Sequence, residues 1–209
     1  MAASCRQITE AVRAAIRKAN RALERATQGE HWLSDFGVES LMVGYVWQAL
    51  CRLNRTGLTL VEMPMSTFDD AMVGRGRKPG PKPRGLRGGG RCDLGLLDAH
   101  GRPFALVELK RSSAPQGLSA DLERMAAALD RYGVHRGGTL TTAVLGVWIA
   151  GATESAFDKK RAAVEAVAET FARRAELRVQ LAPGTEKPRV WKYGDWRCLA
   201  ATISLQRAK

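Results

Sequence analysis

Cysteine is scarce in this chain, and the few cysteines present are not arranged for a metal site or a disulfide framework. The four, Cys5, Cys51, Cys92 and Cys198, are scattered and include no Cys-x-x-Cys pair. Such spacing predicts neither zinc binding nor disulfides, so we expect four small core residues. The chain also lacks the Gly-x-x-x-x-Gly-Lys-Ser/Thr sequence that cradles nucleotide phosphates, which argues against an ATP-driven activity.

Long hydrophobic runs are missing too. The longest, residues 143–152, has ten residues, too few for a helix that crosses about 30 Å of hydrocarbon. The N-terminal region has no continuous apolar stretch before a small-residue cleavage site, so we expect no secretory signal. An arginine-rich first helix could mimic a mitochondrial transit peptide, but Glu10 and Glu24 argue against it. We expect a cytoplasmic protein with no membrane partner.

Composition is that of an ordinary globular protein. Hydrophobic residues make up 45% and charged residues 26% of the 209 residues, which excludes disordered, collagen-like and fibrous classes. The length and the even composition predict one domain over residues 1–209.

Acidic residues are few relative to basic ones. The chain has 33 Lys and Arg, 24 of them Arg, against 21 Asp and Glu, which leaves a net charge of +12. An arginine-rich excess suits a phosphate-bearing partner, because the guanidinium group can bind two oxygens at once. The alternative is that arginine abundance reflects only the codon composition of the genome.

More than half of that excess lies in one segment, residues 74–91, which we name the basic segment. It has seven Gly, seven Lys or Arg, three Pro and Leu86, and no acidic residue. Such a composition predicts a mobile loop that buries no apolar surface.

The hydrophobic pattern on either side predicts an α/β fold with a mixed β-sheet. Three- and four-residue spacing predicts helices over 7–27, 36–54, 119–132 with Ser119 as N-cap, and 154–175. Apolar runs predict strands over 58–63, 92–97, 104–109, 141–150, 177–181 and 196–205, with a turn-prone stretch from Pro64. Residues 98–103 have hairpin chemistry, and the run 141–150, apolar on both faces, predicts a buried central strand.

Charged residues stand at two strand ends in this pattern. Asp93 begins one hairpin strand, and Glu108-Leu109-Lys110 closes the next. This Asp and Glu-x-Lys pair, on a hairpin followed by a helix and an apolar strand, resembles the PD-(D/E)XK nuclease superfamily over roughly residues 36–150. Cys92 stands where the family name has proline, a position that varies in the family. The resemblance implies a restriction-endonuclease-like core of order α-β-β-β-α-β, with an extra N-terminal helix and a C-terminal helix plus strands.

The spacing of these residues has a chemical reason. Glu108 and Lys110 are two apart on a strand, so their side chains leave the same face, and the hairpin brings Asp93 alongside. Two crowded carboxylates repel, and Mg²⁺, with Mn²⁺ as a substitute, relieves that repulsion through oxygen ligands. Lys110 would then assist the attacking water. The alternative is that Glu108 and Lys110 emerge in solvent and pair with neighbours, as we expect for the helical triplet Asp158-Lys159-Lys160.

The resemblance implies further ligands. The carbonyl of Leu109 would be one, and an acidic residue from the preceding helix is often another, for which Glu39 is the candidate and Glu62 a weaker one. The candidates for nucleic-acid contact are basic or polar residues of the basic segment or just beyond the Glu-x-Lys strand: Arg75, Arg77, Lys78, Lys82, Arg84, Arg87, Arg91, Arg111, Ser112, Ser113, Gln116, Arg124 and Arg131.

The leading hypothesis is therefore a metal-dependent nuclease that hydrolyses phosphodiester bonds in DNA. One alternative is a non-catalytic nucleic-acid-binding module with the same fold and basic segment, and another is a protein-interaction subunit of a larger complex. A double-strand cutter would be expected to act as a homodimer, although no residue in the sequence indicates an interface.

Overall fold

The computed structural model describes residues 2–29, 31, 33, 39–78, 80–82, 86, 90–111, 114–183, 188–190 and 195–208. In chain order these residues form α1 (Cys5–Ala26), α2 (Glu39–Leu53), β1 (Leu58–Pro64), α3 (Ser66–Val73), β2 (Arg91–Leu97), β3 (Pro103–Lys110), α4 (Pro115–Tyr132), β4 (Thr142–Gly151), α5 (Glu154–Ala172), β5 (Leu177–Pro183), β6 (Arg189–Val190) and β7 (Arg197–Arg207). None of the helices in these ranges is long and apolar enough to cross a bilayer.

The strands form one mixed sheet in the order β1-β2-β3-β4-β7-β5, with β6 paired to β7. Strand β2 pairs antiparallel with both β1 and β3, whereas β3 and β4 are parallel. All ten residues of β4 are buried, which confirms the expected central strand. The predicted α/β class with a mixed sheet and an antiparallel hairpin is confirmed at this level of detail.

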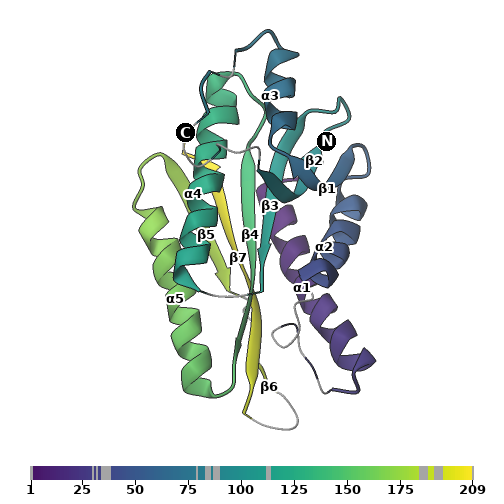
Figure 1. Ribbon diagram of the computed structural model, residues 1–209, viewed down its shortest axis with the longest axis vertical. Coiled ribbons are helices and arrows are strands. Elements are labelled where there is room, and N and C mark those ends of the chain that lie inside the picture. Colours follow the sequence, from purple (N-terminus) through teal and green to yellow (C-terminus); the bar gives the residue numbers. More distant parts are fainter. Residues whose placement is uncertain are drawn as a thin grey trace.

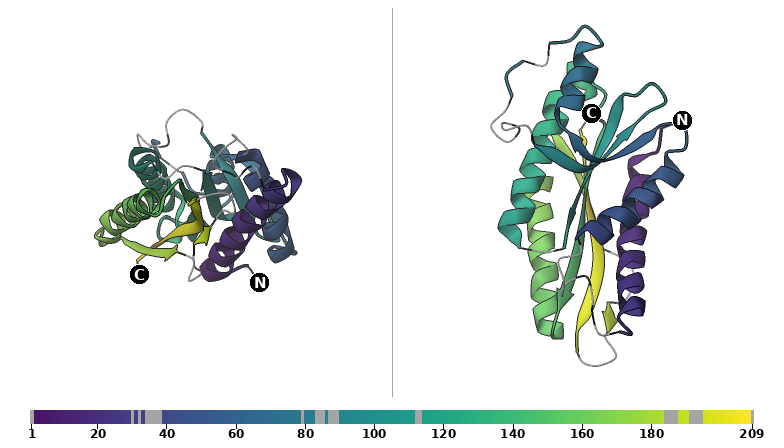
Figure 2. Two further views of the ribbon diagram at one scale, coloured as in Figure 1. Left: turned by 90° about the horizontal axis from the view of Figure 1, so that it is seen from below. Right: turned by 45° about the vertical axis from the view of Figure 1, so that its right-hand side comes forward.

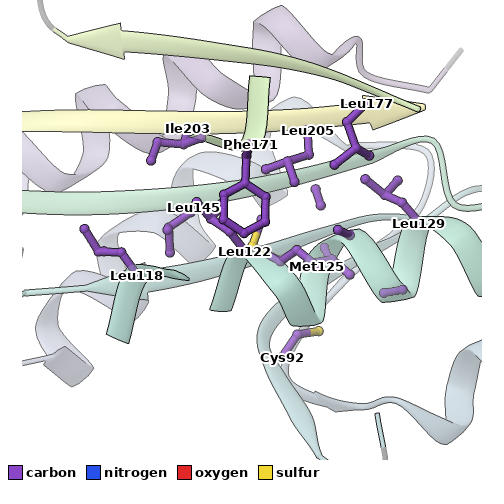
Figure 3. Close-up of a cluster of buried hydrophobic side chains, with 14 of the residues drawn as sticks. Cys92, Leu118, Leu122, Met125, Leu129, Leu145, Phe171, Leu177, Ile203 and Leu205 are labelled. Atoms are coloured by element: carbon purple, nitrogen blue, oxygen red, sulfur yellow. The ribbon is translucent and has the colours of Figure 1, made fainter. Parts of the chain in front are cut away.

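Helices cover both faces of the sheet (Figures 1 and 2). On one face, α1 and α2 pack with residues such as Val12, Ile16 and Val46 against the sheet. On the other face, α3, α4 and α5 enclose the second core, in which Phe171 of α5 meets Leu122 and Met125 of α4 (Figure 3). The helices are amphipathic because their apolar residues recur at three- and four-residue steps, so each buries one stripe.

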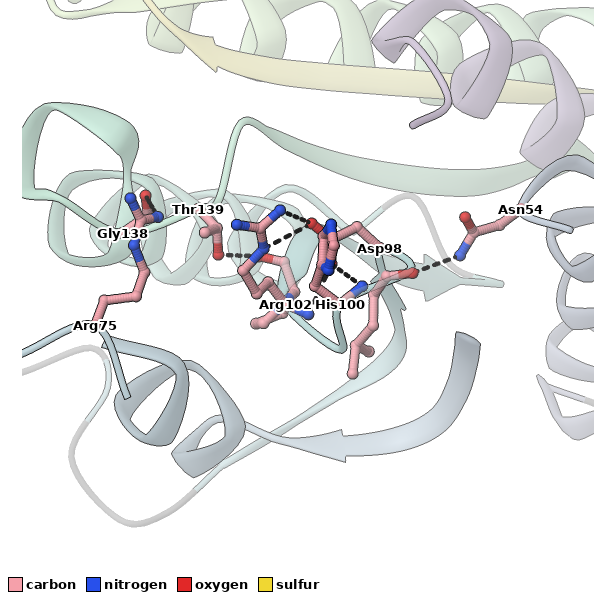
Figure 4. Close-up of polar contacts among 9 residues, drawn as sticks. Asn54, Arg75, Asp98, His100, Arg102, Gly138 and Thr139 are labelled. Atoms are coloured by element: carbon pink, nitrogen blue, oxygen red, sulfur yellow. Dashed lines mark hydrogen bonds and ion pairs between the residues drawn. The ribbon is translucent and has the colours of Figure 1, made fainter. Parts of the chain in front are cut away.

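The hairpin that carries Asp93 and Glu108 has a tightly bonded turn (Figure 4). The Asp98 carboxylate accepts hydrogen bonds from the backbone N–H groups of His100 and Arg102 and from the Arg102 side chain, at 2.8–3.0 Å. The side chain of Asn54, just after α2, donates to the carbonyl of Leu97 at 2.9 Å. These bonds fix the register in which β2 and β3 enter the site.

Several sequence-based expectations differ from the structure. The turn-prone stretch after Pro64 contains α3, whose Phe68 and Met72 are buried. Helix α4 begins at Pro115, so Ser119 lies inside it and is not its N-cap. Proline fits the first turn of a helix because that turn needs no N–H partner. In the basic segment, Leu86 is 3% exposed and belongs to the core, so the segment does bury apolar surface.

Candidate active site

Asp93 lies where β2 separates from β3. The described ladder between the two strands begins at the pair Leu94 and Val107. Just before it, the half-buried Asp93 carboxylate accepts a hydrogen bond of 2.7 Å from the backbone N–H of Leu109. Burial raises the pKa of Asp93 above its ordinary value, while the Leu109 bond, Lys110 and Arg124 oppose that rise. The Asp93 carboxylate therefore accepts a backbone hydrogen bond from β3, and it also lies close enough to Lys110 for the two charges to interact.

Glu108 is a buried carboxyl group, 4% exposed. Nη2 of Arg124, on α4, lies 2.7 Å from its Oε1. Burial raises the pKa of Glu108 to about 7; Arg124 lowers it, and the nearby Asp93 and Asp121 carboxylates raise it further. Asp93 and Glu108 are thus close enough to influence each other's charge, as the hairpin predicts.

Lys110 leaves the same face of β3 as Glu108 and also reaches α4. Its Nζ lies 3.2 Å from Oδ2 of Asp121. Burial lowers the pKa of Lys110, but Asp121, Glu39 and Glu108 together outweigh that effect and raise it. The Lys110 side chain is 35% exposed, so the ammonium group is at the boundary between the core and water. It is held as a cation.

Asp121 is a site residue that the sequence did not reveal, and Arg124, expected to contact nucleic acid, is instead paired with carboxylates of this cluster. They are one turn apart on α4, and Nη2 of Arg124 also lies 2.9 Å from Oδ1 of Asp121. Asp121 is 5% exposed, and its Oδ2 has an ion pair with Lys110 but accepts no well-aligned hydrogen bond within the described ranges. The sequence does hold an indication that Asp121 is buried: it lies three residues after Leu118 and four before Met125, on the apolar face of the helix.

The other predicted metal ligands are less closely associated with the cluster of Asp93, Glu108 and Lys110. Glu39 is the first residue of α2, half-buried, and near enough to Lys110 to raise its pKa. Glu62 instead forms an exposed ion pair of 2.9 Å with Arg91. Leu109 places its side chain in the core between the sheet and α1.

Cys92, at the position of the family's proline, is buried. Burial, Glu108 and Asp93 raise the pKa of its thiol, so Cys92 is a structural residue.

The donor chemistry of the cluster fits a hard divalent cation. Its carboxylates belong to Asp93, Glu108 and Asp121, and one oxygen of Asp121 lacks a hydrogen bond. The carboxylates are not arranged as a metal site in this structure, because within the described ranges no three His, Cys, Asp or Glu residues are grouped to hold a metal ion. The Arg124 guanidinium bridges Glu108 and Asp121 instead. A cation could take those oxygens only if Arg124 moved off Glu108.

Several cations that we expected to contact nucleic acid have partners within the chain. Arg75 donates to the carbonyl of Gly138 at 3.1 Å, and Lys82 pairs with Asp69 at 3.2 Å. Arg131 is 5% exposed and donates to the carbonyls of Gly80 and Pro81 and to Asp69, so it anchors the basic segment and is not a surface contact.

The remaining candidates divide into two groups. Arg77, Lys78, Arg111 and Gln116 are exposed. Arg84, Arg87, Ser112 and Ser113 lie outside the described residues. The triplet Asp158-Lys159-Lys160 lies in α5, as expected from its helical spacing.

Comparison with known proteins finds no matching family model, no matching curated protein and no matching solved structure. The described residues form an α/β fold whose β2–β3 hairpin brings two carboxylates and a lysine beside α4.

Proposed function

We propose that this chain is a metal-dependent nuclease that hydrolyses phosphodiester bonds in DNA, on a restriction-endonuclease-like core. The observation that carries the proposal is the convergence of Asp93, Glu108 and Lys110, from two neighbouring strands, on one partly buried cluster. The order of helix, hairpin, helix and parallel strand around the cluster is in keeping with such a core.

Each residue has a role that its surroundings support. Asp93 and Glu108 supply carboxylate oxygens, and Glu39 and the Leu109 carbonyl are the candidates to complete the ligand set. When bound, Mg²⁺ or Mn²⁺ would polarise the phosphodiester and lower the pKa of a coordinated water. Lys110 has a raised pKa and is paired with Asp121. It therefore acts as a cation that orients the water and stabilises charge on the phosphorane, and not as a general base.

The test replaces the two groups without disturbing their neighbours. Asp93→Asn keeps an oxygen for the Leu109 N–H but removes the charge, and Lys110→Met keeps the aliphatic chain. Each variant should cleave plasmid DNA in Mg²⁺ on the order of 10²-fold more slowly than the parent. Gel-based cleavage rates, with EDTA as the blank, measure the loss.

Matched controls are available on α5. Asp158→Asn and Lys159→Met make the same chemical changes at exposed positions and should leave cleavage within about two-fold of the parent. Circular dichroism and thermal unfolding check that all four variants fold. Parental cleavage rates in both site variants would show that the cluster is not catalytic.

A second candidate function is a non-catalytic nucleic-acid-binding module. The observation that favours it is Arg124, which neutralises Glu108 and Asp121 at 2.7 and 2.9 Å with no metal required. A metal titration of DNA binding separates the candidates. A nuclease should cut DNA when Mg²⁺ is added, whereas a binding module should hold it with an affinity that falls with salt and shows no specific requirement for divalent metal.

A further inference from the structure

A hollow lined by arginines lies beside the C-terminal half of α1, away from the residues of the proposed active site. It has a volume of about 470 Å³ and is lined by Arg21, Glu24, Arg25, Gln28, Gly29 and Arg189. Arg189 comes from β6, which lies at the same end of the molecule as the end of α1 (Figures 1 and 2). A smaller hollow of about 50 Å³ shares Arg21 and Arg189 and reaches Trp148 of β4. We name the two together the arginine hollow.

The charges in the arginine hollow favour an anion. Arg189 is held in place by Glu24, with Nη1 and Nη2 at 2.8 and 3.0 Å from its two carboxylate oxygens. Arg21 and Arg25 are exposed, and neither has an ion pair with any described residue. The one carboxylate of the lining is thus used by Arg189, and two guanidinium groups are left to bind an anion bidentately.

A buried hydrogen-bond donor supports the same conclusion independently. Trp148 is 3% exposed and lines the smaller hollow, and its indole N–H has no acceptor among the described residues. A buried donor without a partner is costly, and a small movement that brought an anionic oxygen to it from the hollow would relieve that cost. The indole and the arginines are all donors, as a site for phosphate oxygens requires.

The arginines of α1 form a row that is longer than a site for a single phosphate group. Arg13, Arg17, Arg21 and Arg25 follow one another at four-residue steps and form an oblique row on α1, half-buried at Arg13 and Arg17 and exposed at Arg21 and Arg25. At 1.5 Å per residue the row is about 18 Å long. Duplex DNA carries one charge per about 1.7 Å, so about ten phosphate charges fall within that length. A chain of phosphates matches the row better than an isolated ion.

We propose that the arginine hollow and the adjoining arginine row of α1 bind the phosphate backbone of a nucleic acid. This surface is separate from the basic segment, in which Arg75, Lys82 and Arg91 already have internal partners. It goes beyond the proposed nuclease activity, because it requires no metal and no cleavage. Arg21 and Arg25 contact phosphate oxygens, and the buried Trp148 indole beneath them senses the bound phosphate.

The experiment measures binding in EDTA, so that catalysis plays no part. A fluorescein-labelled 20-base-pair duplex is titrated with the parent, with Arg21→Gln/Arg25→Gln, and with the control Arg173→Gln/Arg178→Gln. The control removes two exposed charges, one just after α5 and one in β5. Anisotropy is recorded at several salt concentrations. Loss of two phosphate contacts should lower the slope of log K against log salt by about 1.8 in the first variant. The control should change it much less.

Nitrogen-15 NMR supplies a readout at the site itself. Trp148→Phe identifies the indole signal of Trp148 among those of the five tryptophans. DNA should shift that signal in the parent and not in Arg21→Gln/Arg25→Gln. Equal slope changes in the two double variants, or an indole signal that DNA does not move, would overturn the proposal. A shift produced by inorganic phosphate but not by the duplex would overturn the assignment to nucleic acid.

Discussion

The Glu108 carboxyl shows what a single buried group does to this protein. It is 4% exposed, and burial raises its pKa to about 7 from an ordinary value of 4.5. Between these two values the folded chain holds a proton on Glu108 that the unfolded chain has released. The free energy of unfolding must therefore fall as the pH rises through this interval, because the unfolded state binds fewer protons.

Glu108→Gln removes this dependence because an amide does not titrate. In EDTA, the free energy of unfolding of the parent should fall relative to the variant between pH 4.5 and pH 7, by up to ~3 kcal/mol. In the variant Arg124 keeps Asp121 and loses its ion pair with Glu108, and this loss adds an offset to the free energy of unfolding. Urea unfolding at pH 5 and pH 8 measures the change, and a difference between the two proteins that is the same at both pH values would contradict it.

Sequence reasoning could bring together the residues that share one local pattern. Glu108 and Lys110 are two apart on a strand, and the hairpin places Asp93 beside Glu108, so those three could be grouped from spacing alone. Asp121 and Arg124 could not be placed, because their contacts with β3 depend on how α4 returns to the sheet. The internal partners of Arg75, Lys82 and Arg131 are equally nonlocal.

At the scale of elements, the β2–β3 hairpin depends on the carboxylate of Asp98. It accepts two backbone N–H groups and a side-chain bond from Arg102, and it is the main polar contact of the turn (Figure 4). Asp98→Ala should lower the free energy of unfolding by ~1–2 kcal/mol, because both N–H groups lose their acceptor. Denaturant unfolding measures this loss.

Asp98→Asn is the matched variant for that hairpin. It keeps one side-chain oxygen for the backbone N–H groups and loses only the charge that pairs with Arg102 at 2.7 Å. Its loss of stability should be smaller than that of Asp98→Ala, since an ion pair that is partly open to solvent contributes little. Equal stability of Asp98→Ala and the parent would show that the turn does not depend on these bonds.

Helix α3, which the sequence pattern did not predict, is stabilised by residues that are distant from it in the chain. Helix α3 has eight residues, which is too short for its spacing to stand out. It is stabilised by tertiary contacts, among them the stacking of Phe68 on Tyr132 of α4, with ring centroids 5.1 Å apart. Pattern within a window predicts long amphipathic helices such as α1 well, but it carries little information about short ones.

At the scale of the whole molecule, the close approach of α1 to the sheet depends on Gly146 of β4. A Cβ atom there would come within 2.8 Å of side-chain atoms of Ile16 and Leu109 and 2.9 Å of Val12. Gly146→Val should therefore lower the free energy of unfolding by ~1–3 kcal/mol through overpacking, and Gly146→Ala by less. Thermal and urea unfolding measure both.

Gly44 of α2 is the control for that prediction. A Cβ atom at Gly44 meets nothing within 4 Å, so Gly44→Ala should stabilise the protein by ~0.5–1 kcal/mol through helix propensity. If Gly146→Val were as stable as the parent, α1 and the sheet would not be in tight contact at this point.

The strand order is the part of the fold that the sequence could not supply. Six of the strands could be located from apolar runs, but their neighbours depend on long-range pairing. Strand β7 comes last in the chain and yet lies between β4 and β5, where it pairs with both. No local pattern distinguishes that position from an edge.

Helix α4 is bonded to two different parts of the protein, one at its middle and one near its C-terminal end. In the middle of the helix, Asp121 and Arg124 form ion pairs with Lys110 and Glu108, and near its C-terminal end Arg131 donates to the carbonyls of Gly80 and Pro81. The two anchor points are about 15 Å apart along the helix axis, at 1.5 Å per residue. A shift of α4 along its axis would therefore weaken the ion pairs of the carboxylate cluster and the hydrogen bonds to Gly80 and Pro81 together.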